Sequence, residues 1–280
     1  MPHVAPHGGT SWTMPALLRA SVGLHACAAG VALAAPHAAW YALGAVVLDH
    51  AAITAAGLLP RCGWLGPNIT RLGETSAQWG EVALTIDDGP DPQVTPQVLD
   101  TLEAHGLRAS FFCIAEKARR HPALVREIAA RGHSVQNHSD HHPLGFATLG
   151  PRRMRAEIER AQETLAQLTR ERPLFFRAPA GLRNPFLDPA LHRLGLQLVS
   201  WTRRAYDTRE GRPQRVLERL CRGLAGGDIL LLHDGNAARS PDGRPVILEV
   251  LPLLAQRMQA LGLHAVTLPQ ALQPRRSAFA

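Results

Sequence analysis

The chain has 280 residues, which suffices for one large domain or two small ones, and 46% of them are hydrophobic, which can supply a sizeable core. Its formal charge of +7 rests on arginine, because Lys117 is the only lysine. The arginines form no basic stripe interleaved with aromatic side chains and the four cysteines form no CxxC pair, so we expect no nucleic-acid partner, no thiolate zinc site and no disulfide framework.

Residues 1–60 form an apolar segment. Between positions 15 and 59 the only charged residues are Arg19 and Asp49, and the apolar runs 20–35 and 38–59 are joined by a Pro-His pair. A helix that spans a bilayer needs about 20 apolar residues, a length that the second run has and the first barely reaches. The sequence therefore predicts two membrane helices in a hairpin, with Asp49 as a costly residue in lipid.

The arginines around this segment predict its orientation. Arg19 flanks the first run, Arg61 and Arg71 follow the second, and the connecting segment has no Lys or Arg. The positive-inside rule then places both ends of the hairpin, and the domain that follows, on the cytoplasmic side of a bacterial-type inner membrane.

Two other interpretations of the apolar segment stay open. Arg19 followed by the Ala32-Leu33-Ala34 run resembles a signal peptide with its cleavage site, which leaves the second apolar run without a role. A soluble Ala-rich helical pair that caps the main domain also fits the composition. The next segment, 61–80, is rich in glycine and has no clear period, so we expect a linker or a collar around the main domain.

Strand-like and helix-like segments alternate over 81–272, which we take as the main domain, followed by a tail at 273–280. Strands are expected at 82–86, 109–114, 134–136, 174–176, 196–201, 229–232 and 265–268. Helices are expected at 95–104, 116–131, 151–170, 213–224 and 246–261. Seven strands that alternate with helices predict an α/β fold with a parallel sheet, either open and doubly wound or closed as a barrel.

Titratable or cationic residues follow five of these strands. They are Asp87-Asp88, the histidines of 138–142, Arg177, Asp207 and His233-Asp234. The carboxyl ends of parallel strands meet at one face, so we expect these groups to lie together. Taken alone, Asp-Asp-Gly-Pro at 87–90 is also a good turn sequence, and the two acids by themselves do not establish chemistry.

His138 and His142 predict a metal site. On a helical turn, residues four apart face the same side and can share one ion. One carboxylate from elsewhere completes a two-His-one-carboxylate set, which suits Zn²⁺ first and also Co²⁺, Ni²⁺ or Fe²⁺. A His-rich surface loop is the alternative, because the chain has 14 histidines.

Five motifs occur in order at the expected strand ends. They are TIDDGP (85–90), HSDHH (138–142), RAPAG (177–181), WTRRAYD (201–207) and LLHD (231–234). Together they resemble the NodB-homology polysaccharide deacetylases, carbohydrate esterase family 4, over residues 81–268. The resemblance implies a distorted (β/α)₇ barrel, here preceded by the apolar helical hairpin, and a metal-dependent hydrolase that removes an acetyl or formyl group from the nitrogen of an amino sugar.

The resemblance also implies a role for each motif residue. The implied catalytic residues are Asp87 as general base, His233 as general acid, Arg177 beside the base and Asp207 beside the acid. The implied metal ligands are Asp88, His138 and His142, with Ser139 bracing their loop. The implied substrate-binding wall consists of Pro179, Ala180, Gly181 and Leu231. The carboxylate of Asp207 should raise the pKa of His233 and keep it available as an acid.

Three departures from the family pattern affect the expected substrate. Ala180 stands where the family usually has an aromatic residue, Thr208 where it often has tryptophan, and Arg203-Arg204 where many members have an acid. A more cationic site with less stacking surface suits a smaller, anionic or lipid-phosphate-linked amino sugar at least as well as chitin or peptidoglycan. Alternatives are an O-acyl esterase, a hydrolase of non-sugar amides and a non-catalytic, membrane-anchored sugar-binding protein.

Overall fold

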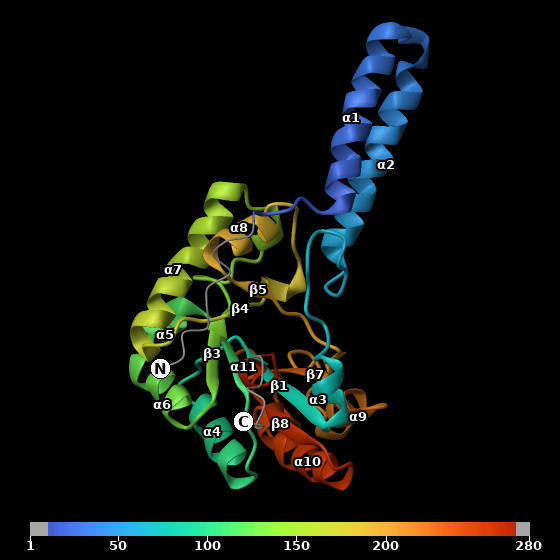
Figure 1. The fold of residues 1–280 in the computed structure, drawn as a ribbon. Helices are drawn as coiled ribbons and strands as arrows, with labels where there is room; N and C mark the ends of the chain where they lie inside the picture. Colours follow the sequence, from blue (N-terminus) through green and yellow to red (C-terminus); the bar gives the residue numbers. More distant parts are fainter. Residues whose placement is uncertain (1–10, 273–280) are drawn as a thin grey trace, which may run out of the picture.

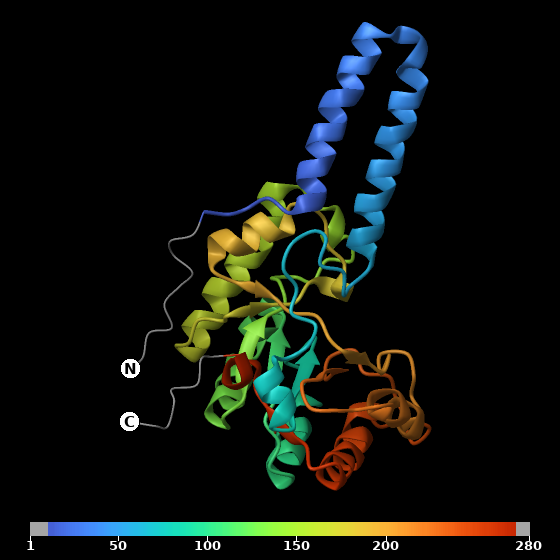
Figure 2. The same cartoon turned by 45° about the vertical axis from the view of Figure 1, so that its right-hand side comes forward.

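Two long antiparallel helices project from one end of an α/β domain (Figure 1). They are α1 (Ala16–Ala34) and α2 (Ala39–Leu58), joined by the 3₁₀ turn η1 (Pro36–Ala38). Both are long and apolar enough to cross a membrane, and most of their surface is free of contact with the domain (Figure 2). The computed structural model describes residues 11–272, so the tail predicted at 273–280 and the start of the apolar segment lie outside the described residues.

The polar residues of the hairpin face one another between the two helices. Ser21 Oγ donates a hydrogen bond to Asp49 Oδ2 at 2.6 Å. The Nε2 atoms of His25 and His50 lie 3.3 Å apart. Asp49 therefore has a partner inside the hairpin, which reduces the cost of placing its carboxylate in lipid.

The α/β domain is built on a parallel sheet of eight described strands. The strands are β1 (Glu81–Asp87), β2 (Ser110–Cys113), β3 (Ser134–Asn137), β4 (Phe175–Phe176), β5 (Gln197–Leu198), β6 (Arg203–Arg204), β7 (Ile229–His233) and β8 (His264–Val266). Their order is β5-β4-β3-β2-β1-β7-β6, and β8 pairs with β1. Every pairing is parallel, which confirms the predicted fold as a distorted, incomplete barrel.

Helices cover the outside of this sheet (Figure 1). Those of eight residues or more are α4 (Thr95–Ala104), α6 (Pro122–Ala130), α7 (Pro151–Thr169), α8 (Leu187–Leu194), α9 (Pro213–Cys221) and α10 (Val246–Ala260). The short helical elements are α3 (Glu74–Gln78), α5 (Ala115–Arg120), η2 (Phe146–Thr148), η3 (Pro179–Gly181) and α11 (Leu268–Leu272).

Three details differ from the expected elements. The helix expected over 116–131 is two helices, because Pro122 has no N–H to continue α5 and instead begins α6. Helix α8 and the two-residue strand β6 were not predicted. Leu268 was expected in the last strand, but it begins α11.

The pleat of β1 divides its side chains between two cores. Val82, Leu84 and Ile86 pack in the large core between the sheet and the helices. Ala83 packs in a smaller core on the other face, with residues of β2, β4 and β7. Because successive side chains alternate, Asp87 belongs to the same face as Ala83 and points into the barrel.

The segment after the hairpin, 61–80, runs along the connection between β5 and β6. Ile69 N donates to Leu198 O at 2.9 Å, and Thr202 Oγ1 donates to Thr70 O at 2.7 Å. Leu72 N donates to Gly227 O at 2.8 Å just before β7. These bonds tie the segment to the domain and match a collar better than a free linker.

Candidate active site

Asp87 and Asp88 lie where the chain leaves β1, and their side chains take different directions. Asp87 is the last strand residue and pairs in register with His233 of β7. Asp88 has a left-handed backbone conformation with φ 72°, which breaks the strand alternation. Lys117 Nζ donates to the carbonyl oxygen of Asp88 at 2.8 Å and supports this turn. The two adjacent carboxylates can therefore serve different partners.

Asp88, His138 and His142 form the predicted three-residue cluster. Asp88 Oδ1 lies 3.2 Å from His138 Nε2 and 3.4 Å from His142 Nε2. The ligand atoms of all three lie within 4.8 Å of one another. The helical turn expected to join the histidines is wrong: they lie on a loop in which Ser139 and His142 have positive φ values of 69° and 52°.

Ser139 braces this loop through both its backbone and its side chain. Its N–H donates to Asn137 Oδ1 at 2.9 Å, and its hydroxyl accepts the N–H of His142 at 3.0 Å. The hydroxyl contact holds His142 next to His138, whose ring centroid is 4.8 Å away. The hydroxyl of Ser139 thus holds the two histidines together without the helical turn that we expected.

The cluster fits a divalent cation by three independent criteria. Asp88 Oδ1 is buried and accepts no hydrogen bond, so a lone pair faces the two imidazoles. His138 shares its Nδ1 proton with the carbonyl of Arg177 at 2.8 Å, which leaves Nε2 as the ligand atom. Burial and the nearby His138 lower the pKa of His142, which favours the neutral, metal-binding imidazole.

The charge state of Asp88 also fits the binding of a divalent cation. Burial alone would raise the pKa of its carboxyl, but the adjacent His138 and the charges of the other surrounding histidines together lower it. Asn236 Nδ2 donates to Asp88 Oδ2 at 3.1 Å, so the second carboxylate oxygen is held while Oδ1 stays free. Asp88 is therefore ionised and oriented with Oδ1 toward the two imidazoles, as a metal ligand would be.

Arg177 holds Asp87 from inside the barrel. Its side chain is 1% exposed, and Nη1 donates to Asp87 Oδ1 at 2.6 Å and to Thr85 Oγ1 at 2.8 Å. Nη2 and Nε donate to the carbonyls of Ser200 and Val199 at 2.9 and 3.2 Å. Such a buried pair is stable only when its remaining donors are satisfied, as they are here. Asp87 Oδ2 is left pointing toward the metal cluster, 3.8 Å from the Nε2 of His138.

His233 and Asp207 form the second pair of the site. His233 Nδ1 lies 2.9 Å from Asp207 Oδ1, and its backbone N–H donates to Asp207 Oδ2 at 2.8 Å. Burial tends to lower the pKa of His233, but the hydrogen bond and charge of Asp207, with the charges of Asp87 and Asp88, raise it overall. The raised pKa of His233 agrees with the predicted direction. Because Nδ1 contacts Asp207, Nε2 is the imidazole nitrogen that remains free to contact a substrate.

These groups surround one cavity of about 210 Å³ at the carboxyl ends of the strands. Its lining includes Asp87, Asp88, His138, His142, Ala180, Gly181, Leu231 and His233. Arg177 and Asp207 lie behind this lining, each against its partner. Pro179 is buried in η3 and is not among the lining residues, because the turn directs Ala180 and Gly181 to the cavity instead.

Five residues that line the cavity were not predicted as site residues: Ala178, Trp201, Arg204, Thr208 and Asn236. Trp201 supplies an aromatic wall that Ala180 does not, and Arg204 and Asn236 contribute polar groups. Trp201 begins the WTRRAYD motif, and Asn236 follows His233 by three positions, so their places beside known motifs were the available signal.

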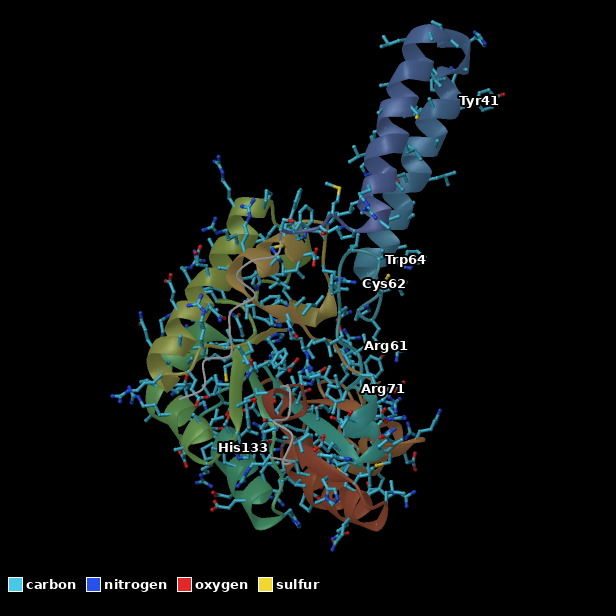
Figure 3. All side chains as sticks on the ribbon, in the orientation of Figure 1. Tyr41, Arg61, Cys62, Trp64, Arg71 and His133 are labelled. Atoms are coloured by element: carbon cyan, nitrogen blue, oxygen red, sulfur yellow. The ribbon has the colours of Figure 1, made fainter. Side chains whose placement is uncertain are left out.

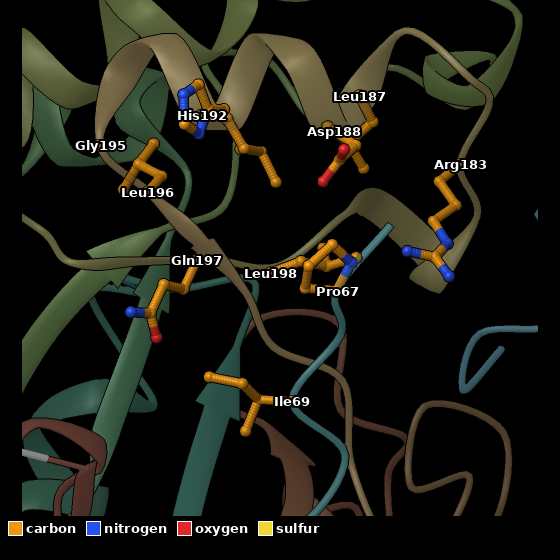
Figure 4. A pocket seen from close by; sticks show the side chains of 11 residues that line it. Pro67, Ile69, Arg183, Leu187, Asp188, His192, Gly195, Leu196, Gln197 and Leu198 are labelled. Carbon is orange, nitrogen blue, oxygen red and sulfur yellow. The ribbon is translucent and has the colours of Figure 1, made fainter. Parts of the chain in front are cut away.

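Two other features are weaker candidates for chemistry. Asp140, His141 and Glu157 also cluster, but Arg119 and Arg160 pair with Asp140 at 2.7 and 2.6 Å and balance its charge. A cavity of about 280 Å³ lies between α8, β5 and the 61–80 segment (Figure 4). It is lined mainly by leucines and other apolar groups.

Comparisons with known proteins agree with this geometry. Residues 76–199 match the family model described as polysaccharide deacetylase. The chain is 31% identical over 194 residues to a peptidoglycan-N-acetylglucosamine deacetylase of Bacillus cereus, covering 69% of this chain and 88% of that protein. It is 31% identical over 195 residues to a chitooligosaccharide deacetylase of Azorhizobium caulinodans, covering 67% and 92%. A crystal structure of a peptidoglycan N-acetylglucosamine deacetylase superposes with a TM-score of 0.67 at 26% identity, covering 74% of this chain and 94% of that one.

Proposed function

We propose, from the premise that the chain belongs to the polysaccharide deacetylase family, that it is a metal-dependent N-deacylase of an amino-sugar-containing carbohydrate or lipid-linked sugar. Members of this family are hydrolases of carbon–nitrogen bonds other than peptide bonds, and the chain is one of them. The acyl group that we propose is acetyl or formyl. The observation that carries the proposal is the single cavity that joins the Asp88, His138 and His142 cluster to both Asp87 and His233.

The cluster is proposed to hold the metal, with Zn²⁺ as the first candidate and Co²⁺, Ni²⁺ or Fe²⁺ as alternatives. Two imidazoles and one carboxylate suit these ions and leave open positions for water and substrate. When bound, such an ion polarises the acyl oxygen and lowers the pKa of a water molecule toward about 7.

Asp87 is proposed to act as the general base. Its Oδ1 is fixed by Arg177 at 2.6 Å, so Oδ2 is the atom that accepts a proton from the attacking water. Thr85 shares the same guanidinium nitrogen and fixes its position. Arg177 is thus a positioning residue that keeps the carboxylate correctly oriented.

His233 is proposed to act as the general acid. Asp207 accepts the Nδ1 proton, which fixes the tautomer and leaves Nε2–H to protonate the departing amine. The raised pKa of His233 favours the protonated imidazole that this role requires. The released products are then a carboxylic acid and a free amino group on the sugar.

The substrate class is proposed from the relatives and from the cavity. The two relatives named above are a peptidoglycan-N-acetylglucosamine deacetylase and a chitooligosaccharide deacetylase, so an N-acetylglucosamine unit is the first candidate for the reacting sugar. Trp201 contributes an aromatic wall to the cavity that would hold this sugar. The exposed apolar hairpin favours a substrate at a membrane surface.

The test uses the full chain in detergent. We expect the purified protein to bind about one Zn²⁺ per chain and to release acetate or formate from a panel of N-acyl amino sugars, free and lipid-linked. Chelation should abolish release, and added Zn²⁺ should restore it. Release from O-acetyl sugars alone would identify an esterase instead, and metal binding without any release would support a non-catalytic sugar-binding protein.

A further inference from the structure

Arg204 is held at the edge of the active-site cavity by two aromatic rings. Its guanidinium carbon lies 5.1 Å from the ring centroid of Trp201 and 5.0 Å from that of Tyr206. The stacking fixes a planar cation without using its N–H groups, since cation–π contact occurs through the face. Arg204 lines the same small cavity as the metal cluster and His233.

The charge of Arg204 has no acidic partner among the described residues. No ion pair or hydrogen bond joins its side chain to residues 11–272, and its Nε is buried without a partner. The neighbouring Arg203 behaves differently, because it pairs with the buried Asp228 and donates to the carbonyls of Arg222 and Gly223. An ordered guanidinium with free donors beside a catalytic cavity is suited to an anionic part of the ligand.

A second depression, of about 660 Å³, continues from Arg204 to the base of the helical hairpin. It is lined by residues 59–64, Trp201, Thr202, Arg204 and Tyr206. Two contacts join the base of the hairpin to the site: Ser200 Oγ donates to Pro60 O at 2.6 Å, and Arg61 Nη1 donates to Thr202 O at 3.2 Å. Trp201 and Arg204 line both hollows, so one ligand can occupy both.

The base of the hairpin has the features of a membrane interface. Helix α2 has 20 residues, which at 1.5 Å per residue spans about 30 Å, the thickness of the hydrocarbon layer. Tyr41 lies at the far end and is 83% exposed, whereas Trp64 lies at the near end and is 64% exposed (Figure 3). Exposed aromatic residues at both ends are typical of helices that meet two bilayer surfaces. With the hairpin inserted in a bilayer, the depression would open at the level of the lipid headgroups.

We propose that Arg204, with Arg61, binds the phosphate of an amino sugar that is linked through that phosphate to a membrane lipid. The inference rests on the proposed N-deacylase function and specifies its substrate. The sugar would occupy the cavity beside Trp201, the phosphate would contact Arg204, and the lipid chain would leave past Trp64 toward the hairpin. Arg204 is then a specificity-determining residue, because it selects a phosphate-bearing substrate.

Binding tests the inference without relying on turnover. The full chain in detergent is titrated with N-acetylglucosamine 1-phosphate and with N-acetylglucosamine, and the ratio of the two affinities is the measure. Arg204→Gln should lower this ratio roughly tenfold to a hundredfold, because a charge-assisted hydrogen bond is lost. Arg204→Lys should lower it less, and Arg126→Gln, a change at an exposed arginine on α6, should leave it unchanged. An unchanged ratio in Arg204→Gln would overturn the inference.

The source of the phosphate is tested with a polyprenyl-phosphate-linked N-acetylglucosamine. We expect tighter binding of this lipid than of the soluble sugar phosphate, and Trp64→Ala should remove the difference. Equal binding of both, in wild type and in Trp64→Ala, would contradict the lipid part of the inference. If phosphate selectivity is found but no acyl group is released from any substrate, the inference stands and the proposed hydrolase function fails.

Discussion

Asp87 and His233 occupy matched positions on the paired parallel strands β1 and β7. Both strands end at this level, and both side chains reach the same cavity. Each has a buried partner of opposite charge: Arg177 for Asp87 and Asp207 for His233. The sheet register therefore sets a fixed separation between the proposed base and the proposed acid, and each partner fixes the orientation of its side chain.

The Asp207 carboxylate should control the alkaline limb of the pH profile. A general acid must be protonated, and the raised pKa of His233 keeps it protonated above its usual range. In Asp207→Asn the anion is lost, the pKa of His233 falls, and the alkaline limb of kcat/KM should move to lower pH. Measurement of kcat/KM against pH in both proteins checks this, and an unmoved limb would exclude His233 as the acid. Asp242→Asn, a change at an exposed loop residue, is the control.

Asn236 should tune metal affinity although it is not a ligand in the proposed cluster. Its Nδ2 donates to Asp88 Oδ2, and loss of such an outer contact typically weakens metal binding about 10- to 100-fold. We expect this loss in Asn236→Ala by competition with a chelator of known affinity. His141→Ala is the matched control, because His141 lies between the two ligand histidines in sequence but contacts Glu157 instead. A larger loss in His141→Ala than in Asn236→Ala would contradict the assignment.

His133 should make folding stability depend on pH in the acid range. Burial, with the charges of Arg108 and Arg131, lowers its pKa from 6.5 to about 4 in the folded protein. The unfolded chain therefore binds more protons between these values, and stability falls as pH drops from 6.5 to 4, by up to about 1.4 kcal/mol per unit.

Denaturant unfolding at several pH values measures this effect. His133→Gln should flatten the dependence while keeping an acceptor for the N–H of Ala109, which now donates to His133 Nδ1 at 3.2 Å. The exposed His105→Gln should keep the wild-type slope. Equal slopes in wild type and His133→Gln would show that the dependence arises elsewhere.

The hairpin should place the catalytic domain on the cytoplasmic side. Arg19 and Arg61 lie at the same end of the helix pair, next to the domain, and the turn at the other end has no Lys or Arg. Reporters fused after Leu59 distinguish the two sides: green fluorescent protein should fluoresce and alkaline phosphatase should be inactive. Active phosphatase would reverse the orientation, and release of a cleaved N-terminal peptide would favour a signal peptide instead.

The sheet and most site residues could be predicted from sequence because their signals are regular. Strand-length apolar runs predicted seven of the eight described strands. The carboxyl ends of parallel strands lie at one edge of the sheet, so the polar residues that follow them lie close together. Asp87, Arg177 and His233 were found in this way. The alternation along β1 also explains why Asp87 points into the barrel and joins Thr85 at the guanidinium of Arg177.

The remaining features depend on contacts that one sequence does not reveal. The loop that joins His138 to His142 needs left-handed residues that are not glycine, and its brace is the single hydroxyl of Ser139. Trp201, which follows β5, supplies an aromatic wall to the cavity. The alanine at position 180 had suggested that the aromatic surface of the cavity was reduced. The sequence does not distinguish Arg204 from Arg203. Only the fold places Arg203 beside the acidic Asp228 and leaves Arg204 without an acidic partner among the described residues.

The division of labour between Asp87 and Asp88 is tested most directly by measuring bound metal and turnover in the same samples. Asp87→Asn should retain wild-type metal content and lose about 10²- to 10⁴-fold in kcat, because only the proton acceptor is removed. Asp88→Asn should lose the metal itself. Wild-type turnover in metal-loaded Asp87→Asn, or equal loss of metal in both variants, would contradict the account.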